Sequence, residues 1–260
     1  ITSLPSSYKT DYVFQGWLLE DIKITAPFVY DYETDITLVA EWTGLPEGIA
    51  YVTQGETIKI LSYLGEDIEL ILPDTISGKP IRIIGEEAFK NNSYLETVIL
   101  GRYVSVIENN AFSGMDSLRK IILPNSATIF GAGVFYNSNS LEEITLSSEL
   151  TCELKYLFGN DNSYIPSSLY KIKYANGASI ININLFNDIN MLLTLELADD
   201  WKTIKNNQFQ GLIIKKIIIP EGVISIGNYA FYESTIQEII IPHGVKSIIK
   251  GEVTSPINPM

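Results

Sequence analysis

The sequence contains one cysteine, Cys152, and one histidine, His243. A disulfide within the chain and a zinc site made of thiolates each need at least two cysteines, so a single cysteine excludes both. A single histidine excludes metal sites with several imidazole ligands and leaves one possible base for a Ser-His-Asp triad. The composition therefore argues against a disulfide-rich fold, a resident metal or other cofactor, and most hydrolytic chemistry.

Basic residues are also scarce. The 260 residues include 18 lysines and arginines against 31 aspartates and glutamates, which gives a net charge of -13. A chain this acidic repels phosphate backbones and anionic headgroups, and no apolar run approaches the roughly 20 residues of a membrane span. We therefore expect no nucleic-acid partner and no membrane insertion. Hydrophobic residues make up 46% of the sequence, which favours a folded core over disorder.

Phenylalanine recurs at a nearly constant interval of 22 or 23 residues, with one interval of 28. The series is Phe89, Phe112, Phe135, Phe158, Phe186, Phe209 and Phe231. Aligned on these residues, one unit reads L-x-x-I-x-L-P-x-x-V-x-x-I-G-x-x-A-F. Gly85, Gly131 and Gly227 lie four residues before a phenylalanine, where a backbone corner needs either a positive φ or close approach. These features predict a structural repeat of about 23 residues.

A unit of 23 residues cannot bury its own apolar side, so stacked units must supply each other's core. The sequence therefore predicts a β-rich solenoid with parallel strands. Successive coils lie about 4.8 Å apart, so equivalent phenylalanines should stack as a ladder inside the solenoid. We expect this ladder to be core and not a row of ligand-binding aromatics.

The repeat resembles the BspA-like leucine-rich repeats of bacterial surface proteins, over roughly residues 48–250. The resemblance implies a non-enzymatic, secreted or cell-surface protein that adheres to host matrix or plasma proteins such as fibronectin or fibrinogen. Before the first unit, the segment IAYVTQGETIKILSYLG predicts a hairpin that turns near Gln54 and Gly55 and caps the open end of the solenoid. The sequence shows neither a signal peptide nor an anchor.

The first 43 residues have a different pattern, which resembles the Listeria-Bacteroides repeat, also called the internalin B-repeat. The matching positions are Tyr12, Phe14, Gly16, Trp17, Leu38, Ala40 and Trp42. This resemblance implies that residues 1–43 form a partial β module, with its opening strands absent, and that residues 44–260 form the leucine-rich repeat solenoid. The alternative is a three-stranded cap that belongs to the solenoid.

Three features of the chain could suggest chemistry. The run GNDNS at residues 159–163 has oxygen ligands at short spacing but lacks the bidentate glutamate of a calcium loop, so we expect a surface turn. Cys152 occupies a position that is apolar in other units, which predicts a small buried side chain, and His243 should be an exposed loop residue. Glu153 falls where other units place an isoleucine, and we expect a β-bulge there. The sequence offers no catalytic residue and no metal site.

Side chains two apart on each strand should point outward and repeat on every coil. One outward column reads Thr97, Lys120, Glu143, Lys171, Thr194, Lys216 and Glu238, and the other reads Ile99, Ile122, Thr145, Lys173, Glu196, Ile218 and Ile240. The first column alternates in charge, which suits pairing between strands. The second is apolar at both ends, which indicates an interaction surface, although β-branched residues also favour strands for their own sake.

We therefore expect a protein-binding surface on the strand-lined face. Its candidate residues are Ile99, Lys120, Ile122, Glu143, Tyr170, Lys171, Lys173, Ile218 and Ile240. A passive spacer is one alternative. A glycan-binding module is another, for which Tyr136, Tyr170 and Tyr232 are the available aromatics.

Overall fold

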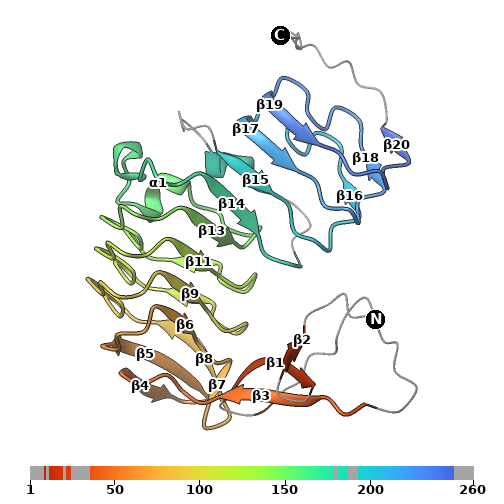
Figure 1. Cartoon of the computed structure of the whole chain (residues 1–260). Coiled ribbons are helices and arrows are strands. Elements are labelled where there is room, and N and C mark those ends of the chain that lie inside the picture. The colour runs from red at the N-terminus through yellow and green to blue at the C-terminus, as the bar shows by residue number, and fades with distance from the viewer. Residues whose placement is uncertain are drawn as a thin grey trace.

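The protein is a stack of about eight β-coils about 23 residues apart, which confirms the predicted solenoid. The computed structural model describes residues 9, 12–19, 22–24, 36–177, 181–186 and 193–248. The coils follow a curve from the hairpin near the N-terminus to the last coils near the C-terminus (Figure 1). Within the described ranges, no helix is long and apolar enough to cross a membrane.

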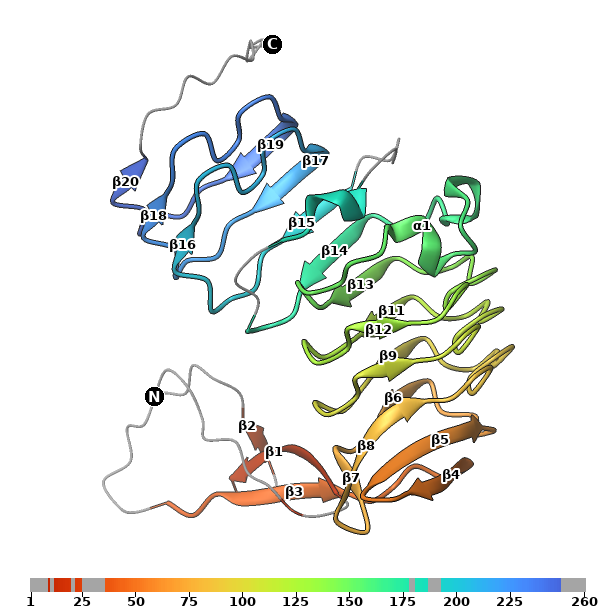
Figure 2. The ribbon, with the colours of Figure 1, turned by 180° about the vertical axis from the view of Figure 1, so that it is seen from behind.

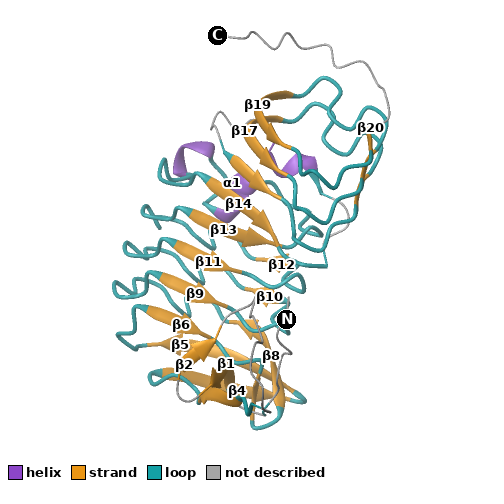
Figure 3. Cartoon of the chain, turned by 45° about the vertical axis from the view of Figure 1, so that its right-hand side comes forward, coloured by secondary structure: helices purple, strands orange, loops and turns teal. Residues whose placement is uncertain are grey.

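One side of the stack is a parallel sheet of eight strands (Figure 3). Each coil contributes one strand, and the strands follow one another in chain order. They are β6 (Glu69–Ile71), β9 (Thr97–Ile99), β11 (Lys120–Ile122), β13 (Glu143–Leu146), β14 (Lys171–Tyr174), β15 (Thr194–Glu196), β17 (Ile213–Ile218) and β19 (Thr235–Ile240). We call this the large sheet.

Two further sheets form the other side of the coils. A six-stranded sheet contains β4 (Ile49–Gln54), β5 (Thr57–Tyr63), β7 (Thr75–Ile76), β8 (Lys79–Ile84), β10 (Val106–Ile107) and β12 (Ile129–Phe130). A three-stranded sheet of later coils contains β16 (Thr203–Ile204), β18 (Ser225–Ile226) and β20 (Ser247–Ile248). The core lies between these two sheets and the large sheet.

The predicted phenylalanine ladder is confirmed in two runs, from Phe89 to Phe158 and from Phe209 to Phe231. Ring centroids are 4.8 Å apart between Phe89 and Phe112, 5.9 Å between Phe112 and Phe135, 5.7 Å between Phe135 and Phe158, and 5.3 Å between Phe209 and Phe231. All members are fully buried except Phe186, which is 9% exposed, and Phe231, which is half-buried. Backbone hydrogen bonds run beside the rings, as from Phe112 N to Val134 O at 2.9 Å.

The corner glycines are explained by close approach. Gly85, Gly131 and Gly227 are not among the residues with positive φ. A Cβ added at Gly85 would lie 2.5 Å from the carbonyl oxygen of Ile60, and one at Gly131 would lie 2.3 Å from the backbone nitrogen of Asn109. The preceding coil therefore leaves no room for a side chain at this corner. Positive φ angles occur instead at asparagines, such as Asn91, Asn110, Asn137 and Asn207.

The hairpin that the sequence predicts is β4 and β5, which are antiparallel and joined by Gly55 and Glu56. Strand β5 also pairs in parallel with β8, so the hairpin covers the first coil. The Tyr63 ring lies 5.6 Å from Phe89 and begins the ladder. Burial and the Asp67 carboxylate that accepts its hydrogen bond raise the pKa of Tyr63 to about 12.

Before the hairpin, β1 (Val13–Leu19), β2 (Ile22–Ile24) and β3 (Val39–Thr43) form a separate antiparallel sheet in the order β2-β1-β3. Phe14 pairs with Trp42, and Trp17 pairs with Ala40. The predicted pairing of these two segments is therefore confirmed. Trp17 and Trp42 are both half-buried.

The irregular coil in the middle of the chain differs from the prediction. Glu153 does not form a β-bulge but precedes a one-turn helix, α1 (Leu154–Leu157), whose Leu154 and Leu157 are buried. The interval from Phe135 to Phe158 stays at 23 residues, so the helical turn keeps Phe158 in the ladder, and the extra residues fall in the segment after Phe158. The loop that follows contains the short helix η1 (Asn162–Tyr164), where Asp161 accepts a hydrogen bond from Ser163 N. A second short helix, η2 (Ile183–Phe186), precedes β15.

Truncation of one ladder ring should destabilise the whole stack. We expect Phe135→Ala to lower the free energy of unfolding by about 3–5 kcal/mol, because the ring is fully buried between Phe112 and Phe158. Ile129→Ala is the control, since that side chain is 59% exposed and should cost no more than about 1 kcal/mol. Urea denaturation measures both. Equal losses for the two variants would contradict a stabilising role for the ladder.

Candidate functional site

The large sheet carries two continuous columns of outward side chains. Its strands pair in exact register, so Lys120 lies beside Glu143, Glu143 beside Lys171, and Ile99 beside Ile122. The register confirms the predicted columns from β9 to β19. Strand β6 extends each column by one residue, because Glu69 pairs with Thr97 and Ile71 with Ile99.

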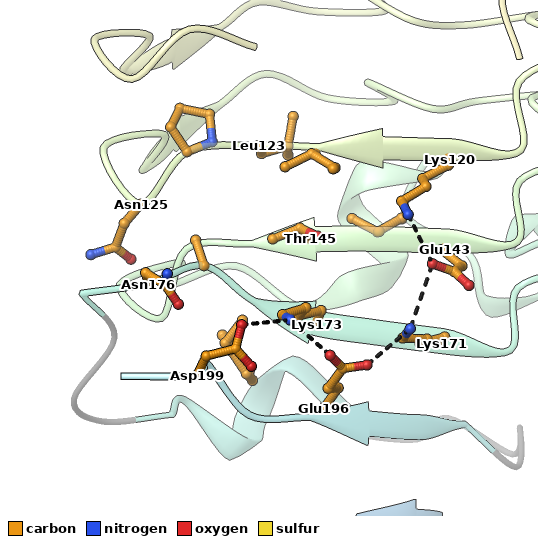
Figure 4. A pocket seen from close by; sticks show the side chains of 15 residues that line it. Lys120, Leu123, Asn125, Glu143, Thr145, Lys171, Lys173, Asn176, Glu196 and Asp199 are labelled. Atoms are coloured by element: carbon orange, nitrogen blue, oxygen red, sulfur yellow. Dashed lines mark hydrogen bonds and ion pairs between the residues drawn. The ribbon is translucent and has the colours of Figure 1, made fainter. Parts of the chain in front are cut away.

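Six charged side chains near the middle of this face form an unbroken chain of ion pairs, which we call the charge network (Figure 4). The successive distances are 3.7 Å for Lys120–Glu143, 3.6 Å for Glu143–Lys171, 2.9 Å for Lys171–Glu196, 2.8 Å for Glu196–Lys173 and 3.2 Å for Lys173–Asp199. Three lysines face three acids, so the network is neutral.

The pairing shifts the titration of the network. Burial alone would raise the pKa of Glu196, but hydrogen bonds from Lys173 and Lys171 and their positive charges outweigh burial and lower the pKa. Glu143 behaves in the same way: its pKa is lowered by the Tyr170 hydroxyl, at 2.7 Å, and by the neighbouring lysines in spite of burial. The pKa of Lys171 is raised, chiefly by its hydrogen bond to Glu196. Glu143, Glu196, Lys171 and Lys173 are therefore ionised near neutral pH.

A groove of about 470 Å³ opens over the charge network. Asn125 and Asn176 line one end of it, and Thr145 lies between them and the lysines (Figure 4). The corner between these asparagines is recessed, because Ser147 and Ser148 are buried. The groove thus combines amide, carboxylate, ammonium and hydroxyl groups within one recess.

The packing of the corners explains the recess. A Cβ added at Gly177 would lie 3.1 Å from Nδ2 of Asn125, so corners two coils apart meet over the buried serines. The Ser147 hydroxyl donates to the carbonyl oxygen of Asn125 at 2.8 Å. Beneath the groove, Tyr174 replaces the leucine of other coils and is fully buried, and desolvation raises the pKa of its hydroxyl.

The structure gathers five of the nine predicted site residues around the groove. Lys120, Ile122, Glu143, Lys171 and Lys173 line it. Tyr170 lies beside them, because its hydroxyl donates to Glu143.

The remaining isoleucines fall outside the groove. Ile99 is paired with Ile122 at one end of the groove. At the other end, Ile218 lies beside Glu196 and is paired with Ile240. Ile240 is 41% exposed, whereas Ile99, Ile122 and Ile218 are half-buried. The apolar part of this face is therefore two separate groups with a charged centre between them, and Ile71 adds a third isoleucine to the first group.

Sequence reasoning did not single out the corner residues of the groove. Asn125, Asn176 and Asp199 each lie at the same place in the repeat, two residues after the last apolar residue of a strand. That shared position was visible in the sequence. What the sequence did not show was the recessed corner between Asn125 and Asn176, which depends on the packing of three coils.

The other candidates lie away from this groove. Tyr136 packs edge-on against Tyr164 at 5.1 Å, and Tyr232 against Tyr229 at 5.6 Å, so the tyrosines considered for glycan binding do not form one platform. His243 is exposed, as predicted. Cys152 is half-buried against the core, and desolvation raises its pKa to about 11, so the thiol stays protonated near neutral pH.

Loss of a network carboxylate should change the pH dependence of stability. Because the folded-state pKa of Glu196 is lowered, its contribution is present above the unfolded pKa of about 4.3 and is lost as the pH falls through the folded value. We expect Glu196→Gln to be less stable than the parent by about 1 kcal/mol at pH 7, with the difference shrinking between about pH 5 and pH 3.

Thermal unfolding across this pH range measures the difference. Glu221→Gln, at an exposed corner of a later coil, is the control and should follow the parent at every pH. A difference between parent and Glu196→Gln that stays constant down to pH 3 would show that the ion pairs do not stabilise the fold.

Several solved structures are similar to the chain. A leucine-rich repeat protein from T. pallidum shares 21% identity, with a TM-score of 0.43 over 74% of this chain and 84% of that chain. A leucine-rich cell surface protein from Faecalibacterium prausnitzii shares 21% identity, with a TM-score of 0.39 over 78% of this chain and 54% of that chain. A leucine-rich repeat protein from Eubacterium ventriosum shares 20%, with a TM-score of 0.41 over 75% and 52%. The chain spans about half the length of the latter two.

Comparison with curated proteins gives no match. The family model described as the BspA type leucine rich repeat region does match, in six copies, over residues 70–175 and 160–252. The match does not cover residues 1–69, so the resemblance of residues 1–43 to the Listeria-Bacteroides repeat stays a prediction. Because the matched residues make up well over half of the sequence, the chain belongs to the BspA-type leucine-rich repeat family.

Proposed function

We propose that this chain is a non-enzymatic binding protein, secreted or displayed on a bacterial surface, which engages another protein through the outer face of the large sheet. One observation carries the proposal: the Ile99–Ile122 pair and the Ile218–Ile240 pair flank the charge network on one continuous, in-register face. Apolar side chains on both sides of fixed charges suit a protein partner, because the former supply buried area and the latter supply specificity.

The charge network supports binding better than catalysis. General acid-base chemistry calls for a group whose pKa lies near the working pH, whereas the pKa values of Glu143 and Glu196 are lowered and those of Lys171 and Lys173 are raised. Each carboxylate is also held by a lysine. Groups that stay ionised and fixed in position present a constant pattern of charge to a partner.

Membership of the family supports a partner outside the cell. We propose host matrix or plasma proteins, with fibronectin and fibrinogen as the first candidates. We also propose that residues 1–43 and residues 44–260 are separate modules, with the binding face on the second. Strands β1 to β3 pair only with one another among the described strands, which supports this division.

The groove favours a glycan as a second candidate ligand. Asn125, Asn176 and Asp199 bring planar amide and carboxylate groups to one recess, and such groups hydrogen-bond well to sugar hydroxyls. A spacer would need neither this recess nor the flanking isoleucines. Parallel screening on matrix-protein and glycan arrays separates the three functions.

Removal of the apolar pairs should weaken binding to the protein partner. We expect replacement of Ile99, Ile122, Ile218 and Ile240 by serine to lower the affinity for immobilised fibronectin or fibrinogen at least about tenfold, because buried apolar contacts supply much of the binding energy. Surface plasmon resonance measures the affinity, and circular dichroism confirms that the variant is folded.

Ile129→Ser combined with Ile224→Ser is the matched control. These side chains are 59% and 49% exposed but lie off the large sheet, so the affinity should stay unchanged. If the parent binds neither fibronectin nor fibrinogen, the proposal that this chain adheres to these two host proteins is wrong. If the folded quadruple variant binds as tightly as the parent, the large sheet is not the binding face.

A further inference from the structure

Strand β4 forms the outer edge of the six-stranded sheet, at the N-terminal end of the stack (Figure 2). It pairs with β5 on one side, and none of the described strands pairs with it on the other. Its side chains are exposed from Ala50 to Gln54, and the apolar Tyr51 and Val52 are 41% and 39% exposed. Two large apolar side chains at a sheet edge are unusual unless a partner covers them.

The hairpin register shows which backbone groups of β4 face outward. The two-residue turn at Gly55 and Glu56 makes Gln54 and Thr57 the closing hydrogen-bonded pair. Such pairs alternate along an antiparallel ladder, so Val52 is hydrogen-bonded to Lys59 and the pairs on either side are not. The N–H and C=O groups of Tyr51 and Thr53 therefore point away from β5, spaced as in the edge of a ladder.

This edge lacks the usual protection. Proteins block exposed edges with lysine, proline or an inward charge, and the β4 sequence IAYVTQ contains none of these. The strand beside the edge, β5, is anchored to a later coil. Lys59 on β5 contacts both carboxylate oxygens of Glu108 at 2.8 and 2.7 Å, and Glu108 also accepts from Glu86 N at 2.8 Å. Because β4 is paired along its length with this anchored strand, it should lose little entropy when a further strand is added to its open edge.

We propose that β4 binds an extended peptide segment of another protein by strand addition, at a site separate from the large sheet. Tyr51 pairs with the buried Ile60, so its side chain lies on the core-facing side of the sheet, yet it is 41% exposed. Side chains of the added strand that point to the same side would cover Tyr51. Outward backbone groups recognise an extended peptide of any sequence, and the side chains and flanking charges supply selectivity.

The charges around the edge define the occupant further. Glu47 and Glu56 flank β4 at its two ends and are exposed, Glu56 even though Lys79 lies 3.8 Å away. Antiparallel pairing with β4 of a second copy would bring Glu47 of each chain toward Glu56 of the other, which like-charge repulsion opposes. The occupant is therefore a β-branched or apolar segment with basic residues on both sides, and not a second copy of this chain.

The test uses the whole chain and a synthetic peptide, acetyl-Lys-Lys-Thr-Val-Thr-Val-Thr-Lys-Lys-amide, followed by amide hydrogen exchange in NMR spectra. We expect saturating peptide to slow exchange at Tyr51 and Thr53 at least about tenfold and to leave Val52, already bonded to β5, unchanged. A peptide with glutamate in place of lysine should bind at least about tenfold more weakly.

Thr53→Pro removes an outward N–H at a position where an edge strand tolerates proline, and it should weaken peptide binding at least about tenfold. Thr53→Val keeps the N–H and should bind like the parent. Absence of protection at Tyr51 and Thr53 with millimolar peptide, or equal binding by Thr53→Pro, overturns the proposal. If the glutamate peptide binds as tightly as the lysine peptide, the inference that the occupant carries basic residues on both sides is wrong. None of these results bears on fibronectin or fibrinogen binding at the large sheet.

Discussion

The stacking of one buried aromatic ring per coil is the constraint on which the rest of the structure depends. A coil of 23 residues has too little apolar surface to fold alone, and the rings from Tyr63 through Phe158 join successive coils at 4.8 to 5.9 Å. A ring can stack only if each coil returns to the same place. The repeat length, the corner glycines that admit the neighbouring backbone, and the exact register of the large sheet all follow from this requirement.

Exact register has a consequence for the surface. Each outward side chain lies directly beside its equivalent on the next coil, so identical charges would face each other at the strand spacing of about 4.8 Å. The sequence avoids this by alternation: Lys120, Glu143 and Lys171 follow one another in one column, and Lys173 precedes Glu196 in the next. The charge network is therefore a requirement of the fold before it is a feature that a partner can use.

Those parts of the structure that repeat could be predicted from the sequence, and those that depend on one irregular coil could not. The ladder, the two columns and the hairpin follow from spacing alone, because position in the repeat determines position in space. The helical turn at Leu154–Leu157 replaced the expected bulge. The groove arises where Gly177 meets Asn125 over buried serines, a contact between corners two coils apart that no periodic pattern encodes.

The same reasoning distinguishes the two proposed binding surfaces. On the large sheet every backbone group within a central strand is already paired, so a partner can read only side chains, and it meets lysines and acids that satisfy one another. Net attraction must then come from the isoleucine pairs and the corner amides of the groove. At β4 the side chains carry no charge, and the outward backbone groups of Tyr51 and Thr53 supply the attraction. A solenoid therefore offers selective recognition along its faces and sequence-tolerant recognition at its end.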